Sequence, residues 1–277
     1  MNHFHEVLID WHHRLSMAFL MSSVPTFLLT ISVTAPFGRH AREKKWWHGP
    51  SVDAKLSWMA FELPNLLWSY YCYNYFNSLG INWVGSGVSL NALLLGLFTA
   101  HYVNRAIIYP LRMNEGSAKV PLIVTCSACA VTALNGYLQA VYLCNIKSLG
   151  TMTLSLDNLQ HFIGLMIFLS GMYINIHSDS VLRNLRRSNT TSNGDRKQYF
   201  IPYSPFFKYV SCPNFAGEIL EWFGYCIISE FSVPSIAFCV YTASNLVPRA
   251  IAHHTWYLTK FEDYPKERRW AVIPWVV

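Results

Sequence analysis

The sequence of 277 residues is poor in charge: 13% of its residues are Asp, Glu, Lys or Arg, whereas 52% are hydrophobic. Soluble domains carry roughly 25% charged residues, so this scarcity argues against a soluble globular protein. The net charge of +6 comes from basic residues scattered between apolar runs, which does not suit a nucleic-acid surface. We therefore predict an integral membrane protein with no nucleic-acid partner, in which abundant aromatic residues act as interfacial anchors.

The motifs that hold nucleotides or metals in soluble enzymes are missing as well. There is no GxGxxG turn, no P-loop and no HExxH helix. A lone CxxC motif, Cys126 with Cys129, lacks the second pair or the polar setting that zinc or redox chemistry needs. We expect no metal and no disulfide. Any cofactor site must be built from side chains on helices.

What the chain does contain is a series of long apolar segments. A bilayer core of about 30 Å needs about 20 apolar residues per helix. We predict an all-α integral membrane protein, a single domain over 1–277 with seven transmembrane helices and with the cofactor and substrate site inside the bundle. The predicted helices lie near 15–35, 54–76, 86–110, 119–145, 157–182, 213–229 and 231–258.

Lys and Arg are distributed unevenly between the two ends of this predicted bundle. They gather in the loops after the first, third and fifth helices and in the C-terminal tail, whereas the opposite side keeps Arg14 and Lys147. Because cytoplasmic loops are rich in Lys and Arg, we predict a cytoplasmic C-terminus. We expect a multi-pass monomer in the endoplasmic reticulum of a eukaryote or in the inner membrane of a bacterium.

Residues 171–186, GMYINIHSDSVLRNLR, place polar groups at the end of a membrane helix. With 3.6 residues per turn, Asn175, Asp179 and Arg183 fall close to one stripe, and Arg186 lies beside it. Amide, carboxylate and guanidinium groups in one line suit the amide, ribose hydroxyls and phosphates of a nucleotide. Arginines that reach anionic headgroups are the alternative, but this leaves Asn175 and Asp179 unexplained.

Polar side chains also interrupt two other predicted helices. Glu62 lies in SWMAFELPNLLW, and a carboxylate within the membrane is either protonated or paired. The structural alternative is a hydrogen bond to backbone groups freed by Pro64. Tyr102 recurs with Arg105 and Tyr109 at helical spacing, which fits either packing with a satisfied hydroxyl or a functional role.

Two segments nearer the C-terminus combine polar and aromatic residues. Asn214 stands in the first turn of a predicted helix, and Glu218 follows one turn later. The last predicted helix carries Arg249, His253 and Tyr257 on one face. These residues can be interpreted as a binding site. For Asn214 and Glu218 the alternative is an interfacial helix or a capped helix start.

Three stretches closely resemble the steroid 5-alpha-reductase family, also called 3-oxo-5-alpha-steroid 4-dehydrogenases: GMYINIHSDSVLRNLR, YVSCPNFAGEILEWFGY and HHTWYLTKFEDYPKERRWAVIPWVV. APFGRH, FELP and HYVNRAIIYPLR match too, in the family's order. The resemblance implies a seven-helix membrane enzyme that binds NADPH within the bundle. It also implies reduction of the carbon–carbon double bond of a 3-oxo-4-ene steroid, by hydride transfer and then protonation.

The resemblance further implies roles for individual residues. Glu62 and Tyr102 are the expected catalytic pair, which hydrogen-bonds the substrate carbonyl as negative charge develops there. Glu62 can donate only when protonated, a state that burial in lipid favours. The residues expected to bind NADPH are Asn175, Asp179, Arg186, Tyr199, Asn214, Glu218, Arg249, His253 and Tyr257.

One position departs from the family pattern and leaves other functions open. Phe61 stands where many members have glutamine, so the substrate lacks one expected polar contact. Alternative enzymes are a related membrane reductase of an enoyl thioester or polyprenol, and a membrane methyltransferase with a similar C-terminal pocket. A receptor or lipid carrier is the non-enzymatic alternative. A carrier predicts no nucleotide site, and a methyltransferase needs no acid such as Glu62 near a carbonyl.

Overall fold

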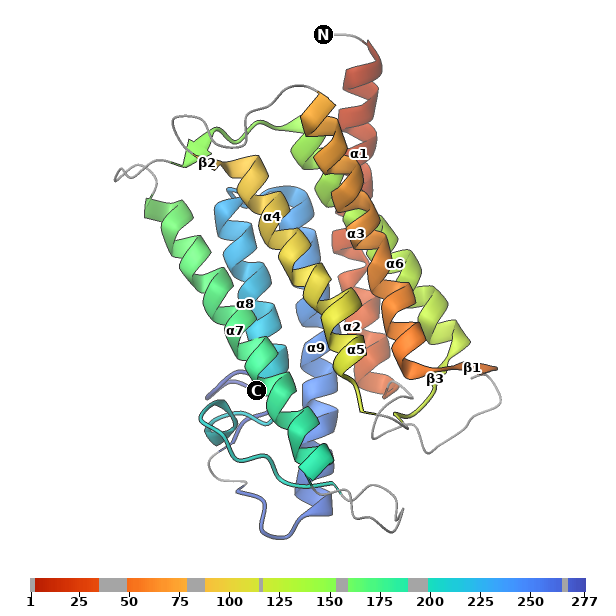
Figure 1. Ribbon diagram of the computed structural model, residues 1–277, viewed down its shortest axis with the longest axis vertical. Coiled ribbons are helices and arrows are strands. Elements are labelled where there is room, and N and C mark those ends of the chain that lie inside the picture. Colours follow the sequence, from red (N-terminus) through yellow and green to blue (C-terminus); the bar gives the residue numbers. More distant parts are fainter. Residues whose placement is uncertain are drawn as a thin grey trace.

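The computed structural model describes residues 3–34, 49–78, 88–114, 117–152, 159–188, 199–265 and 269–277, which form a bundle of helices running alternately up and down (Figure 1). The α-helices are α1 (His3–Met21), α2 (Ser23–Ser32), α3 (Ala54–Ser78), α4 (Leu90–Val103), α5 (Tyr109–Arg112), α6 (Leu122–Val141), α7 (Leu159–Ser188), α8 (Pro213–Ile228) and α9 (Val233–Lys260). Shorter segments with π-helical or 3-10 geometry are η3 (Asn104–Ile108), η4 (Tyr142–Ile146) and η6 (Phe206–Lys208).

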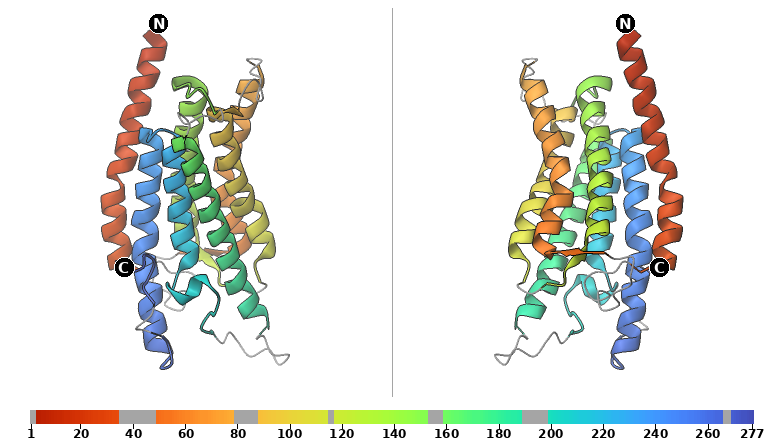
Figure 2. Two further views of the ribbon diagram at one scale, coloured as in Figure 1. Left: turned by 90° about the vertical axis from the view of Figure 1, so that its left-hand side faces the viewer. Right: turned by 90° about the vertical axis from the view of Figure 1, so that its right-hand side faces the viewer.

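Four stretches of the described chain are long and apolar enough to cross a membrane: His5–Ser32, Leu90–Arg112, Leu122–Ile146 and Leu159–Arg186. The prediction of a helical, multi-pass membrane protein is therefore confirmed in its general form. The helices α3, α8 and α9 run alongside these stretches (Figure 2). Whether they also cross the membrane, which would give seven crossings, stays a prediction.

The first helix begins well before the predicted position near residue 15. The helix α1 starts at His3, and its polar first half lies against η4 and the end of α6. His5 Nε2 lies 2.9 Å from the backbone oxygen of Asn145, and His12 Nε2 lies 2.9 Å from that of Leu138. These histidines satisfy backbone oxygens of a neighbouring helix, so a hydropathy pattern alone misses the helix start.

Two very short antiparallel ladders fasten the ends of the bundle. The strand β1 (Ser51–Val52) pairs with β3 (Val120–Pro121), and β2 (Val88–Ser89) pairs with β4 (Thr151–Met152). The first ladder joins the starts of α3 and α6, and the second lies at the opposite end of the bundle (Figure 1). The structure is therefore almost, but not wholly, α-helical.

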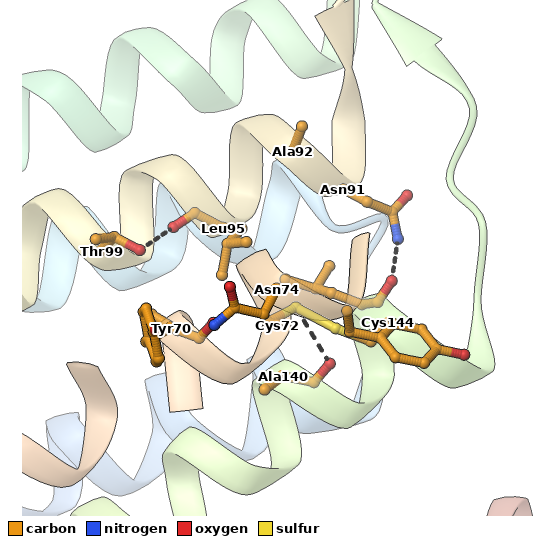
Figure 3. Close-up of a disulfide and its surroundings, with 12 residues drawn as sticks. Tyr70, Cys72, Asn74, Asn91, Ala92, Leu95, Thr99, Ala140 and Cys144 are labelled. Carbon is orange, nitrogen blue, oxygen red and sulfur yellow. Dashed lines mark hydrogen bonds between the residues drawn. A yellow bond between two sulfur atoms is a disulfide. The ribbon is translucent and has the colours of Figure 1, made fainter. Parts of the chain in front are cut away.

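A disulfide between Cys72 of α3 and Cys144 of η4 contradicts the prediction that the chain has none (Figure 3). Their Cα atoms lie 6.1 Å apart, within the range that a disulfide bridges. The two cysteines are 72 residues apart and lie in apolar segments, so no spacing pattern reveals them. Only the parallel packing of α3 against α6 brings them to the same level.

Candidate active site

The side chain of Arg105 lies between three carboxylates from three different helices. Its Nη1 is 3.2 Å from Oδ2 of Asp179 on α7, and its Nη2 is 3.9 Å from Oε2 of Glu218 on α8. Its Nε is 3.9 Å from Oε1 of Glu62 on α3. The rings of Trp58 and Tyr109 cover the guanidinium, each with its centroid 4.9 Å from Cζ. This arrangement satisfies buried charges that would otherwise be costly.

The local helix geometry contributes to this position of Arg105. Arg105 lies in η3, where the backbone widens to π-helical hydrogen bonding between α4 and α5. Such widened turns are rare and occur frequently at functional sites. One predicted catalytic residue, Glu62, and two predicted cofactor residues, Asp179 and Glu218, therefore meet at one arginine that the sequence-based site did not include.

Four of the predicted cofactor residues form one hydrogen-bonded group between α7 and α8. The side-chain amide of Asn214 donates to Oδ1 of Asp179 over 3.0 Å. The amide of Asn175 donates to the backbone oxygen of Asn214 over 2.9 Å and to Oε2 of Glu218 over 3.3 Å. The first two residues of the stripe expected on α7, Asn175 and Asp179, thus face the start of α8, whereas Arg183 bonds to Ser180 of its own helix.

Glycines explain why these two helices approach so closely. A Cβ atom at Gly171 of α7 would lie 2.4 Å from the backbone nitrogen of Glu221, and one at Gly224 of α8 would lie 2.4 Å from that of Phe168. A Cβ at Gly217 would lie 2.6 Å from the backbone nitrogen of Asn175. Small residues allow helix backbones to touch in membrane proteins. Here they set the short side chains of Asn175 and Asn214 within hydrogen-bonding reach.

Tyr102 of α4 is buried one helical turn before Arg105. Its ring packs against Phe98, with centroids 4.6 Å apart, and against Trp222, with centroids 6.0 Å apart. Its hydroxyl accepts a hydrogen bond from the side chain of Asn135 over 3.3 Å. No hydrogen bond joins Tyr102 to Glu62 in the described part of the chain, so a direct structural bond between them does not account for the pair.

Arg249 and His253 both lie close to the ring of Phe215, the residue after Asn214. The guanidinium carbon of Arg249 is 5.1 Å from the centroid of the Phe215 ring, and the His253 ring is 5.8 Å from it. Arg249 also donates to Oδ1 of Asn245 over 3.2 Å. These two predicted residues are therefore adjacent to the α7–α8 group through the start of α8.

The remaining predicted residues gather at the basic end of the bundle. Arg186, Tyr199 and Tyr257 line one small pocket between α7, the segment after it and α9. The Arg186 guanidinium carbon is 5.7 Å from the centroid of the Tyr199 ring. Asn175 and Arg186 are eleven residues apart on α7, or about 16 Å along a straight helix. The predicted cofactor residues thus extend from the middle of the bundle to its basic end.

This donor set suits a dinucleotide. Amides and carboxylates that can bond a carboxamide and ribose hydroxyls lie in the interior at Asn175, Asp179, Asn214 and Glu218. Guanidinium groups that can bond phosphate lie at Arg186 and, beside α8, at Arg249. Among the described residues the buried Nε atom of Arg105 has no hydrogen-bond partner, which leaves one donor of this cluster available.

Sequence reasoning missed several buried polar residues beside the site. Arg105 is absent from the predicted site, although its guanidinium contacts both the predicted catalytic residue Glu62 and the predicted cofactor residue Asp179. Asn65, Asn135 and Gln139 form a buried chain of amides that reaches Tyr102. The spacing of Asn135 and Gln139 by four residues in an apolar segment was the available signal.

Comparison with known proteins finds similarity along nearly the whole chain. The profile of a family described as 3-oxo-5-alpha-steroid 4-dehydrogenase matches residues 118–277. A steroid 5-alpha-reductase of Arabidopsis thaliana is 36% identical over 271 residues, which covers 94% of each chain. One of Gossypium hirsutum is 34% identical over 277 residues, covering 95% of this chain and 96% of the relative. The 3-oxo-5-alpha-steroid 4-dehydrogenase 1 of Homo sapiens is 36% identical over 265 residues, or 94% of each.

Proposed function

The chain belongs to the 3-oxo-5-alpha-steroid 4-dehydrogenase family of oxidoreductases, and we propose that it reduces the carbon–carbon double bond of a 3-oxo-4-ene steroid with NADPH. The observation that carries this proposal is the contact of Arg105 with both halves of the site. Glu62 on one side belongs to the proposed catalytic pair, and Asp179 and Glu218 on the other belong to the proposed cofactor site.

Catalysis rests on stabilising negative charge at the substrate carbonyl. Bound NADPH would supply a hydride to the β-carbon of the enone, and negative charge would then develop on the carbonyl oxygen. Tyr102 donates its phenolic hydrogen to that oxygen, and Glu62 donates to it in its protonated form. Donors placed at such an oxygen are worth about 10²–10³-fold in rate each. A proton then adds to the α-carbon, and the enone becomes a saturated ketone.

The helices α7, α8 and α9 hold the cofactor. Asn175, Asp179, Asn214 and Glu218 bind its polar groups in the interior, where their side chains already bond one another. Arg186 binds a phosphate at the basic end, with Tyr199 and Tyr257 in the same pocket. Arg249 and His253 complete the site from α9.

The two ends of the bundle support a cytoplasmic C-terminus. Lys55, Arg112 and Lys260 lie at the ends of α3, α5 and α9 that point the same way, whereas Lys147 and the disulfide lie at the opposite end (Figure 1). Cytoplasmic loops are rich in Lys and Arg, and disulfides persist in oxidising compartments. This orientation opens the Arg186 pocket toward the cytoplasm, where reduced nicotinamide cofactors occur.

A reductase of another lipid, such as an enoyl thioester or a polyprenol, is the second candidate, and Phe61 favours it. The Phe61 ring packs against Trp58 with centroids 5.1 Å apart, and its backbone oxygen accepts a hydrogen bond from Thr132. Phe61 therefore supplies packing at a position from which many family members present an amide. A substrate with a less polar ketone region would fit this change.

A substrate panel tests the proposal. Purified protein and NADPH are mixed with a 3-oxo-4-ene steroid, with an enoyl thioester or with a polyprenol. The absorbance of NADPH is followed in each mixture, and that of the enone in the mixture with the steroid. We expect matched loss of both absorbances with the steroid. Turnover with another lipid alone would replace the steroid by the second candidate, and absence of NADPH binding would contradict the cofactor site.

A further inference from the structure

Three buried amide side chains form a continuous hydrogen-bonded chain beside Tyr102. Asn65 of α3 and Asn135 of α6 are 0% exposed, and Gln139 of α6 is 3% exposed. The Asn135 amide donates to Oδ1 of Asn65 and to the Tyr102 hydroxyl, each over 3.3 Å. The Gln139 amide donates to Oδ1 of Asn135 over 3.3 Å and to the backbone oxygen of Pro234 over 3.0 Å. None of these amides belongs to the proposed cofactor site.

A backbone group fixes the direction of this chain. The backbone oxygen of Pro234 can only accept, so the nitrogen of Gln139 must face it. The second hydrogen of that nitrogen then points to Asn135, whose oxygen must be the atom that receives it. The nitrogen of Asn135 is consequently turned toward Tyr102. Each amide orients the next because an amide has one donor end and one acceptor end.

The direction of the chain decides what Tyr102 can do. A phenolic hydroxyl can donate or accept, and here Asn135 makes it an acceptor. Its own hydrogen is therefore left for another partner. No residue in the described part of the chain accepts it, although the Tyr102 side chain is only 2% exposed. A buried hydroxyl with a spare donor suits a site that must donate to a substrate oxygen.

We propose that Asn135 is a positioning residue, which holds the Tyr102 hydroxyl as an acceptor so that its hydrogen is directed to the substrate carbonyl. Gln139 and the backbone oxygen of Pro234 maintain the orientation of Asn135. The inference rests on the proposed function, because it needs Tyr102 to donate during the reaction. It adds that the donor is oriented before the substrate binds, which avoids reorganisation as charge develops.

A purely structural role for Asn135 makes a different prediction. The amides also join α3 to α6, next to Gly136, where a Cβ atom would lie 2.7 Å from Cδ1 of Trp68. If they serve only this packing, changing Asn135 lowers stability and leaves the turnover of folded protein unchanged. If Asn135 acts through Tyr102, turnover falls, and the loss depends on the Tyr102 hydroxyl.

The test is a double-variant comparison of Asn135→Asp with Tyr102→Phe. An aspartate at 135 keeps the size of the side chain but cannot donate to both Asn65 and Tyr102. We expect Asn135→Asp to lower kcat for steroid reduction roughly tenfold or more, with the Kd for NADPH within about twofold of wild type. In the Tyr102→Phe background the same change should cost less than about twofold, since no hydroxyl remains to orient.

Two further variants keep the test decisive. Gln139→Met removes the donor that orients Asn135, and it serves as the test variant if the Asn135→Asp protein does not fold. The loss of kcat caused by Gln139→Met should also vanish in the Tyr102→Phe background. Asn91→Asp is the matched control, because Asn91 is a buried amide near the disulfide (Figure 3). Its side chain is bonded to the backbone of Leu143, Lys147 and Leu149. Its effect on kcat should be the same with or without the Tyr102 hydroxyl.

The outcomes separate this inference from the proposed function. Unchanged kcat in Asn135→Asp, or an equal loss with and without the Tyr102 hydroxyl, would overturn the positioning role while Tyr102→Phe still impairs turnover. Full turnover in Tyr102→Phe itself would instead remove Tyr102 from the mechanism.

Discussion

Arg105 is the residue on which the proposed site most depends. It is the cation that faces Glu62, Asp179 and Glu218, and the rings around it exclude water. Removing one partner of a buried ion pair typically costs about 3–5 kcal/mol, because the remaining charges lose their compensation. Arg105 therefore stabilises the fold in addition to any contact with ligands. A substitution of Arg105 would affect stability and catalysis together, so it is a poor first test of catalysis.

Glu62 and Tyr102 can be tested with smaller changes. Glu62→Met and Tyr102→Phe should each lower kcat about 10²–10³-fold with NADPH affinity near wild type, because each loses a donor to the carbonyl oxygen. The double variant should lose less than the product of the two factors, since both groups act on one oxygen. Steady-state kinetics and NADPH titration measure these effects.

Tyr70→Phe provides the matched control, because Tyr70 is exposed on α3. Its turnover should equal that of the wild type. If both site variants keep near-full turnover, the proposed mechanism is wrong. If they only unfold at lower temperature, the pair is structural.

Arg186 should help to select NADPH over NADH. Its guanidinium lies in the pocket with Tyr199 and Tyr257, and guanidinium recognises phosphate in a bidentate way. Arg186→Gln should raise the Kd for NADPH about tenfold and change the Kd for NADH little, measured by fluorescence titration. Arg14→Gln, at an exposed arginine of α1, is the charge-matched control. Equal affinity of the wild type for both cofactors would refute this role.

At the scale of single residues, the sequence predicts some contacts of the site and misses others. The helical period correctly places Asn175 and Asp179 on one face of α7, because that inference needs only local geometry. It does not show that Arg105 reaches Asp179, since this contact joins residues 74 positions apart. The Asn135 contact with Tyr102 is missed for the same reason.

At the scale of elements, the pair α7 and α8 determines whether the cofactor residues can meet. Gly171→Leu should separate the two backbones, because even a Cβ at this position would lie 2.4 Å from the Glu221 nitrogen. We expect a lower melting temperature and at least a tenfold higher Kd for NADPH in protein that still folds. Circular dichroism and NADPH titration provide the two measurements.

Gly96 of α4 supplies the control for that substitution. A Cβ at Gly96 has open space within 4 Å, so Gly96→Leu should leave NADPH affinity unchanged. Equal effects of the two substitutions would show that side-chain volume at Gly171 is not what positions the site.

Helix positions are largely readable from hydropathy, but their pairing is not. Apolar segments place α3, α6 and α9 close to where the structure has them, because each must bury apolar surface along its length. The polar start of α1 is missed, since its histidines bond to backbone oxygens of other helices. The glycines Gly171, Gly217 and Gly224 of the α7–α8 contact carry no signal in hydropathy, because their effect appears only when two helices face each other.

At the scale of the whole molecule, the orientation in the membrane follows from the two unlike ends. A tag at Val277 should be accessible from the cytoplasmic side of sealed vesicles, because the basic helix ends and the C-terminal segment lie together (Figure 2). Protease digestion with and without permeabilisation measures this. A tag accessible only from the other side would contradict both the orientation and the cytoplasmic opening of the Arg186 pocket.

The disulfide could not be predicted from single residues or from single helices. Seven cysteines in apolar segments suggest small packing residues, and the pair Cys72 and Cys144 emerges only from the fold. Its place at the end opposite the basic loops agrees with the proposed orientation.

The central claim is that this chain transfers hydride from NADPH to a steroid enone, and isotope labelling tests it most directly. Wild-type protein is given a 3-oxo-4-ene steroid and NADPH deuterated at the transferable position, and the product is analysed by mass spectrometry. The account predicts a saturated ketone with one deuterium at the β-carbon and a solvent-derived proton at the α-carbon. Unreduced steroid with NADPH bound, or a reduced product without deuterium from the cofactor, would contradict it.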